Sequence, residues 1–154
     1  MQIIVDDNAS NYVVHEIAEG DESRYRARFY FDPNGIAMAD GDEHIIFSAE
    51  NRDGWQAVEI ALRFAAGDYL IRANNHNDTG WLTTPWVAIS DGPHAIEFDW
   101  QAASAPGAYD GAMAFWVDGV EQFRQENLDN DTRRIDKARL GAVKDVDNGT
   151  RGIY

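Results

Sequence analysis

The sequence predicts an all-β fold made of short antiparallel strands, and three observations support this. Apolar and polar residues alternate along many short runs, which is the two-residue period of a half-buried strand. Turn signals separate these runs, a pattern typical of a sandwich or barrel. The signals are Asp-Gly or Asn-Gly pairs, which suit the positive φ of tight hairpin turns. They occur at residues 34–35, 40–41, 53–54, 91–92, 110–111, 118–119 and 148–149.

The pattern of residues 111–123 predicts a β-hairpin, the clearest element in the sequence. We expect the other strands to be arranged around it. Met113, Phe115 and Val117 alternate with residues of the opposite face. Asp118-Gly119 then separates this run from a second alternating run, as a type I′ turn requires. The chain is therefore expected to double back here.

The N-terminal half predicts several strands. Residues 2–5 and 11–17 indicate an edge strand and its neighbour, and residues 43–50 indicate a later strand. Between them, residues 24–32 place aromatic side chains on one face and Arg24, Arg26 and Arg28 on the other. We expect these arginines to pair with acidic residues on adjacent strands.

Residues 55–66 fit two periodicities. Val58, Ala61, Leu62 and Ala65 fit one face of a helix, whereas Val58, Ile60, Leu62 and Phe64 alternate as in a strand. We prefer the strand, because Gly67-Asp68 resembles a hairpin turn before the run 69–73 and because the neighbouring segments are all predicted strands.

The C-terminal half continues this pattern. Residues 74–80 are expected to be a polar loop, and Pro85 between Trp81 and Trp86 predicts an edge strand or a bulge. Strands are expected at 94–101 and 135–143, with loops at 102–110 and 127–134 and a turn at 145–149. Residues 150–154 begin a last strand that is cut short, and its open edge could accept another chain.

Length and composition restrict the function. The 154 residues are expected to form one domain, residues 1–154, with a substantial core. A net charge of −14 disfavours nucleic acid as a partner, because phosphate binding needs a basic patch. No stretch is apolar enough for membrane insertion, Met1–Val5 does not resemble a signal peptide, and the absence of cysteine excludes disulfides and thiolate nucleophiles.

Four segments together resemble the laminin-G-like, concanavalin A-like jelly-roll domains of bacterial surface and secreted proteins. They are SRYRARFYFDPNGI (23–36), GPHAIEFDWQA (92–102), AFWVDGV (114–120) and RIDKARLGAV (134–143). The resemblance implies an antiparallel two-sheet jelly-roll sandwich with neighbouring termini. It also implies an extracellular or cell-surface module that binds glycans or proteins, some members through calcium at the rim. Such domains usually end with an aromatic and acidic strand, which is absent after Tyr154.

Loop residues are the candidates for ligand binding. A sugar ring packs on a flat aromatic side chain while planar polar groups bind its hydroxyls. Trp55, Trp81 and Tyr109 follow or lie in polar or small-residue loops, and Asn75, His76 and Asp78 precede Trp81. These six residues are the predicted ligand-binding set. Trp100 and Trp116 alternate regularly within strands, so we expect them to pack in the core or between the sheets.

Asp129 and Asp131 are the candidate metal ligands. Calcium takes six to eight oxygen ligands, and these two carboxylates lie in the loop 127–134. No segment has the spacing of an EF-hand, and the four histidines lack a zinc pattern. Calcium is therefore the one cofactor that the sequence suggests.

The catalytic alternative depends on Glu97 and Asp99. Glycosidases with this fold often carry Glu-x-Asp-x-x-Glu, but Ala102 stands here at the acid/base position. The sequence therefore predicts a non-catalytic extracellular module that binds carbohydrate. Two alternatives stay open: an adhesive module that self-associates by strand sharing at the C-terminal edge, and a degenerate enzyme domain.

Overall fold

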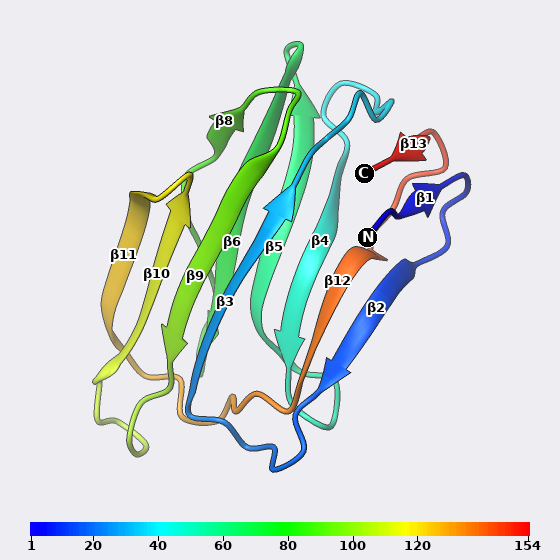
Figure 1. Ribbon diagram of the computed structural model, residues 1–154. Helices are drawn as coiled ribbons and strands as arrows, with labels where there is room; N and C mark the ends of the chain where they lie inside the picture. Colours follow the sequence, from blue (N-terminus) through cyan, green and yellow to red (C-terminus); the bar gives the residue numbers. More distant parts are fainter.

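The computed structural model describes residues 1–154, and the chain forms a sandwich of β-strands without helices (Figure 1). The structure therefore holds no helix long and apolar enough to cross a membrane. The strands are β1 (Ile4–Val5), β2 (Asn11–Glu16), β3 (Arg24–Phe31), β4 (Glu43–Glu50), β5 (Gln56–Ala65), β6 (Asp68–Asn77), β7 (Gly80–Thr83), β8 (Val87–Ile89), β9 (His94–Gln101), β10 (Gly111–Val117), β11 (Val120–Leu128), β12 (Lys137–Lys144) and β13 (Gly152–Ile153).

Two antiparallel sheets form the layers of the sandwich. A four-stranded sheet has the order β11-β10-β9-β3 and lies in front in Figure 1. Behind it, a seven-stranded sheet has the order β2-β12-β4-β5-β6-β7, with β8 also paired to β6. β1 and β13 form a small third sheet. The predicted all-β, two-sheet architecture is confirmed.

The core fills the space between the two main sheets. Phe98, Trp100, Met113 and Phe115 of the four-stranded sheet are completely buried. The seven-stranded sheet contributes Val58, Ile60, Leu62 and Ile71, all equally buried. Aromatic contacts cross the interface, since the ring of Phe47 lies 5.5 Å from that of Phe29 and 5.1 Å from that of Phe98. Burial of these side chains is the main stabilising contribution to the fold.

The ambiguous residues 55–66 form a strand, as predicted. β5 lies between β4 and β6, and a tight turn at Ala66-Gly67 joins it to β6. Both turn residues have positive φ, as do Asp118 and Gly119 in the hairpin between β10 and β11. Such φ pairs are typical of type I′ turns, which explains how these strands reverse direction so closely.

The arginines on β3 have the predicted partners. Arg24 binds Asp99 on β9, with 2.7 Å between Nη2 and Oδ2, and Arg26 binds Glu97 on the same strand. The four side chains lie on the outer face of the four-stranded sheet. These pairs are exposed, so each contributes little to stability.

One predicted loop is part of a strand. Residues 74–77 continue β6, and the reversal occurs at Asp78-Thr79. Asparagine has low strand propensity, but β7 pairs with all four residues and β5 pairs with Asn74 and Asn75. Pro85 lies between β7 and β8, two short strands on the same edge of β6, which confirms the predicted edge position.

The last residues are paired, which corrects the prediction of an open C-terminal edge. β13 pairs with β1, Tyr154 exchanges backbone hydrogen bonds with Ile3, and Arg151 does so with Ala37. The two termini therefore lie close together (Figure 1). Near them, β3 is the last strand of the four-stranded sheet and leaves one edge unpaired, as β2 does at the end of the seven-stranded sheet.

Candidate functional site

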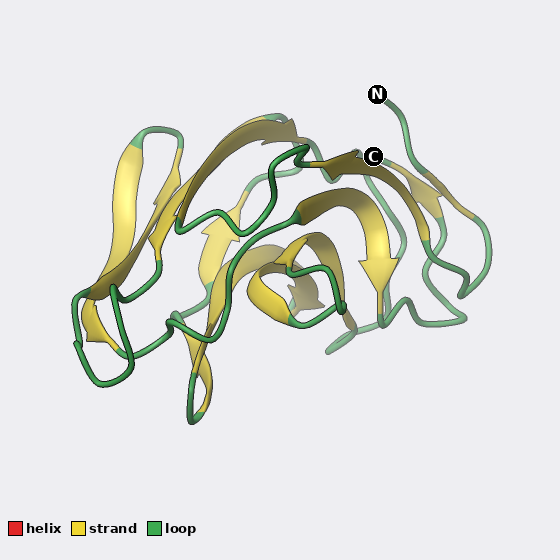
Figure 2. Cartoon of the chain, turned by 90° about the horizontal axis from the view of Figure 1, so that it is seen from below, coloured by secondary structure: helices red, strands yellow, loops and turns green.

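Loops from both sheets meet at one end of the sandwich, shown at the bottom of Figure 1 and facing the viewer in Figure 2. They are the β4–β5 loop, the β6–β7 turn, the β9–β10 loop and the β11–β12 loop. Contacts described below connect seven residues here, which we call the end-loop surface: Trp55, His76, Asp78, Trp81, Asp129, Asp131 and Arg133. Six of them are predicted site residues, so the fold brings most of the predicted set together.

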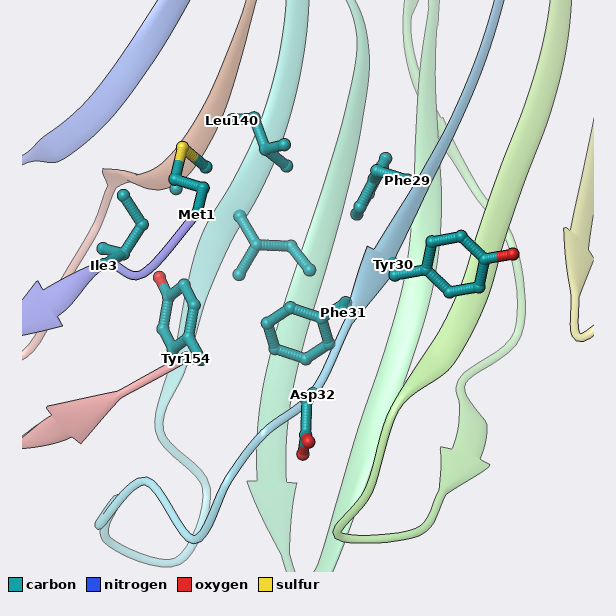
Figure 3. A pocket seen from close by; sticks show the side chains of 10 residues that line it. Met1, Ile3, Phe29, Tyr30, Phe31, Asp32, Leu140 and Tyr154 are labelled. Atoms are coloured by element: carbon teal, nitrogen blue, oxygen red, sulfur yellow. The ribbon is translucent and has the colours of Figure 1, made fainter.

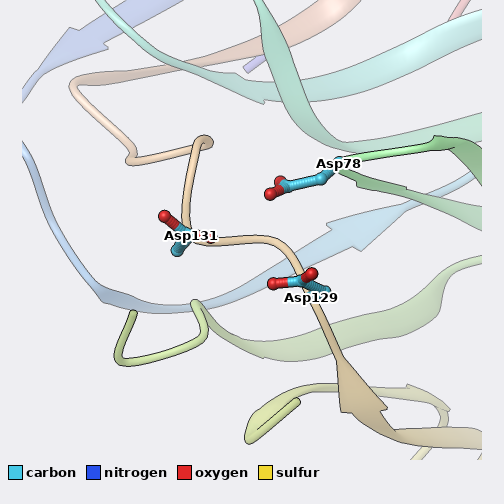
Figure 4. A group of neighbouring side chains, drawn as sticks. All are labelled: Asp78, Asp129 and Asp131. Carbon is cyan, nitrogen blue, oxygen red and sulfur yellow. The ribbon is translucent and has the colours of Figure 1, made fainter. Parts of the chain in front are cut away.

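Three aspartates form the acidic part of the end-loop surface (Figure 4). Carboxylate oxygens of Asp78, Asp129 and Asp131 lie within 4.8 Å of one another. The Asp78 backbone N–H donates to the Asp129 carbonyl at 2.8 Å, and Thr132 Oγ1 donates to Asp78 Oδ1 at 2.6 Å. Gly107 N–H donates to Asp129 Oδ1 at 2.9 Å. Three loops therefore hold the cluster, and Asp78 joins the two predicted metal ligands.

Electrostatic repulsion acts within this cluster. Partial removal from water, followed by the charges of Asp78 and Asp129, raises the pKa of Asp131. A bound cation would relieve this repulsion, and carboxylate oxygens are the ligands that calcium prefers. Three carboxylates can supply up to six oxygens, and water or ligand hydroxyls would complete the shell. The residues present thus fit the predicted calcium in donor type.

Trp81 is the first of two exposed aromatic side chains on the end-loop surface. It is 41% exposed and lies opposite His76 in the β6–β7 register, with 4.9 Å between the ring centroids. Burial, followed by the charge of Arg133, lowers the pKa of His76. At neutral pH this imidazole is therefore neutral and can both donate and accept hydrogen bonds.

Trp55 is the second exposed aromatic side chain, 59% exposed. Its backbone N–H donates to Asn51 Oδ1 at 2.9 Å, and the guanidinium of Arg133 lies 5.1 Å from its ring centroid. Arg133 therefore packs on Trp55, and its charge also acts on His76. Arg133 was not among the predicted site residues, although its position two residues after Asp131 was a signal.

Two predicted ligand residues lie elsewhere. Asn75 is fully buried and accepts a hydrogen bond from the indole of Trp100, so its side chain points into the core and not to the surface. Tyr109 is exposed in the β9–β10 loop with a φ of 52°. Gly107 of the same loop contacts Asp129, but the Tyr109 ring makes no aromatic contact with the end-loop surface.

The outer face of the seven-stranded sheet continues from the end-loop surface. Residues 72, 74 and 76 of β6 share one face, so His76 leads directly to Asn74. The register then places Asn74 beside Glu59, Glu59 beside Ser48, and Ser48 beside Arg139. We call this surface the polar face. Its row of polar residues runs across four strands.

Two buried glutamates on the polar face were not among the predicted site residues. Glu50 Oε1 lies 2.7 Å from Arg139 and 3.2 Å from Lys137, and Glu59 Oε1 lies 2.6 Å from Lys144. Burial raises the pKa of Glu59, and the adjacent Lys144 partly opposes this shift. The alternation of β5 indicates that Glu59 faces outward, but only the long side chains around it make it buried.

The polar face carries much of the molecule's positive charge. At its far end the Arg72 guanidinium lies 4.3 Å, and that of Arg63 5.7 Å, from the ring of Trp86. With Arg133, Lys137, Arg139 and Lys144, these make six of the 13 lysines and arginines. Glu43, Glu50 and Glu59 form ion pairs with four of these six cations, namely Arg72, Lys137, Arg139 and Lys144. A chain with a net charge of −14 thus gathers nearly half of its cationic side chains on and beside this face.

Comparisons with known proteins identify the class of fold. No family model matches the sequence, and no curated protein sequence matches it. Among solved structures, the native heptameric SAP-like pentraxin from Limulus polyphemus superposes with a TM-score of 0.59 at 12% identity, covering 99% of this chain and 71% of the pentraxin. The endo-beta-1,4-glucuronan lyase from Trichoderma reesei gives 0.63 at 14% identity, covering 99% and 75%.

At these identities the likeness concerns the fold. The chain is an antiparallel two-sheet jelly-roll sandwich of the concanavalin A-like class. This confirms the fold that the four sequence segments imply. Their resemblance to laminin-G-like domains of bacterial surface proteins stays a prediction.

Proposed function

We propose that this protein is a non-catalytic carbohydrate-binding module that acts outside the cell or on its surface. The observation that carries the proposal is the end-loop surface, where Trp55 and Trp81 are exposed beside His76 and Arg133. An exposed indole offers a flat apolar surface to a sugar ring. The adjacent imidazole, guanidinium and carboxylates supply the few polar groups that orient a ligand.

The charge of the polar face suggests an acidic polysaccharide as the ligand. A polysaccharide bound at Trp81 could continue along the polar face over Asn74 and Glu59. It would then pass Arg139 and Lys144, whose positive charges attract the carboxylates of an acidic polysaccharide. The name of the fungal lyase states that it acts on glucuronan. That likeness supports an acidic polysaccharide as the first ligand to test.

The absence of catalysis is part of the proposal. Glu97 and Asp99, the glycosidase-like carboxylates, are each engaged by an arginine of β3. Ala102, which stands where a glycosidase would have its acid/base, is buried. This arrangement supports binding without hydrolysis.

Binding to glucuronan and to an uncharged β-1,4-glucan tests the proposal. Isothermal titration calorimetry should show that glucuronan binds to the protein more tightly than the uncharged β-1,4-glucan does. Trp81→Ala should weaken binding at least about tenfold, a loss of roughly 1.4 kcal/mol. The matched control is Trp116→Ala, which should bind normally. Trp116 does not pack in the core as predicted but lies on the outer face of the four-stranded sheet, against Arg26 and Arg124. Failure of both polysaccharides to bind, with and without calcium, would overturn the proposal, as would release of shortened products.

Strand sharing is the second candidate function. The C-terminal edge that was predicted to mediate it is paired, but β3 offers an open edge in the same region. The open edge of β3 favours a protein partner that pairs with it as an added strand.

A further inference from the structure

β3 leaves one side of its backbone unpaired. Its only sheet neighbour is β9. Ala102 N–H donates to the Ser23 carbonyl at 2.8 Å, which fixes the alternation of hydrogen bonds between these two strands. Tyr25, Ala27, Phe29 and Phe31 therefore bond to β9. The N–H and C=O groups of Arg24, Arg26, Arg28 and Tyr30 point to the open side.

An apolar groove runs beside this open edge, and we call it the β3 groove. It comprises two cavities of about 290 and 210 Å³, which share Phe29 and Leu140 in their walls. The larger is also lined by Ile3, Phe31 and Tyr154 (Figure 3). The smaller is also lined by Val13, Tyr25, Ala27 and Phe47. The groove therefore extends along nearly all of β3.

The far wall of the β3 groove is incompletely covered. All six residues of β2 are exposed, including Val13 at 49%, which lies opposite Leu140 and so faces the groove. The four-stranded sheet ends at β3 and so does not reach over β2. One further strand beside β3 would shield this apolar surface and satisfy the free backbone groups at the same time.

We propose that an extended segment of a partner protein, with apolar residues alternating with acidic ones, binds β3 as a fifth strand. Alternate side chains of such a strand would face the apolar groove, which requires them to be apolar. The others would lie on the outer face, opposite Arg24, Arg26 and Arg28. Opposite charges across neighbouring strands stabilise a sheet, so these side chains should be acidic.

Arg28 is the residue that gives the β3 edge a preference for acidic side chains in its partner. Arg24 and Arg26 already bind carboxylates of β9, whereas Arg28 forms no ion pair, although Glu97 lies opposite it in the register. Its guanidinium lies 3.5 Å from the Tyr30 hydroxyl and packs on the Tyr30 ring. Its guanidinium is therefore free to bind a carboxylate from the open side. The net charge of −14 does not prevent this, because salt screens charges beyond about 8 Å at physiological ionic strength.

Two synthetic peptides test the proposal. Both match the eight residues of β3 in length; one alternates valine with glutamate and the other valine with lysine. Fluorescence anisotropy should show that the valine-glutamate peptide binds at least about tenfold more tightly. Trp81→Ala should not change this result, which separates the peptide site from the carbohydrate site.

Changes at residue 28 locate the bound peptide. Arg28→Pro removes an N–H that points to the open side and leaves the β9 bonds in place, so it should abolish peptide binding without unfolding the protein. If circular dichroism shows that this variant is unfolded, Arg28→Glu decides the matter. It should weaken binding of the valine-glutamate peptide and improve binding of the valine-lysine peptide.

Three outcomes would overturn the proposal. They are the absence of binding by either peptide, equal binding of both peptides, and a concentration-dependent dimer of the protein alone that Arg28→Glu disrupts. The last result would show that a second copy of this chain occupies the β3 edge.

Discussion

Trp100 donates its indole N–H to Asn75 Oδ1 at 3.1 Å in the middle of the sandwich. Trp100 belongs to β9 of the four-stranded sheet and Asn75 to β6 of the seven-stranded sheet, and neither is exposed. This bond joins the two layers through the core. It also explains why Asn75, in a segment that was predicted to be a polar loop, is buried in the core.

Asn75→Leu tests this bond. Leucine is similar in size but leaves the indole N–H buried without a partner, so the free energy of unfolding should fall by about 1–3 kcal/mol. Urea denaturation followed by tryptophan fluorescence measures the change. Asn8→Ala, at an exposed position, is the control. Equal stability of the Asn75 variant and the wild type would contradict the assignment.

His44 makes stability depend on pH. Its Nε2 lies 3.1 Å from the Tyr154 hydroxyl, and burial lowers the pKa of His44 from 6.5 to about 4. The unfolded chain therefore takes up a proton near pH 6.5, whereas the folded chain does so only near pH 4. The stabilisation from neutral His44 is complete above pH 6.5 and is lost as the pH falls to 4.

The His44→Gln variant should lack this pH dependence. Between pH 7 and pH 4 the wild type should lose on the order of 3 kcal/mol more than the variant does. Urea titrations at a series of pH values measure the difference. His15→Gln, on the exposed strand β2, is the control. Parallel pH profiles of the wild type and the His44 variant would show that this histidine is not responsible.

The three aspartates predict a response to calcium. Calcium should raise the melting temperature of the wild type, and this increase should disappear in the Asp129→Asn/Asp131→Asn variant. Without calcium, the double variant should be at least as stable as the wild type, because the mutations remove repulsion within the cluster. Asp53→Asn in an exposed turn is the control. A calcium effect that survives in the double variant would place the ion elsewhere.

Gly141 holds β2 against β12. It has a φ of 133°, and a Cβ atom there would lie 2.5 Å from the carbonyl oxygen of Asn11 and 2.9 Å from the Tyr12 Cα. Gly141→Ala should therefore detach β2, with lost hydrogen-exchange protection at Leu140 and Val13. Gly41→Ala also has positive φ but meets no atom within 4 Å. The Gly41→Ala change should lower the free energy of unfolding by about 1 kcal/mol, because alanine adopts a positive φ less readily than glycine does.

Local sequence patterns predicted most strands, because alternation and turn chemistry act over a few residues. The hairpin at Asp118-Gly119 is an example, since its two positive φ values follow from residue type. The strand at residues 74–77 could not be predicted, because it depends on pairing with β7 and, for Asn74 and Asn75, also with β5. The same holds for the sites: the loops around Trp81 suggested the end-loop surface, whereas the burial of Glu50 and Glu59 depends on side chains from other strands.

The pairing of β1 with β13 determines how the domain responds to force. Ile3 lies opposite Tyr154, so tension applied at residues 1 and 154 pulls on the end of this antiparallel ladder. The hydrogen bonds between β1 and β13 then break one after another, because the force acts on only one of them at a time. The two terminal strands should peel away at low force while the remaining sheets stay assembled, so a domain anchored by both ends would lengthen before it unfolds.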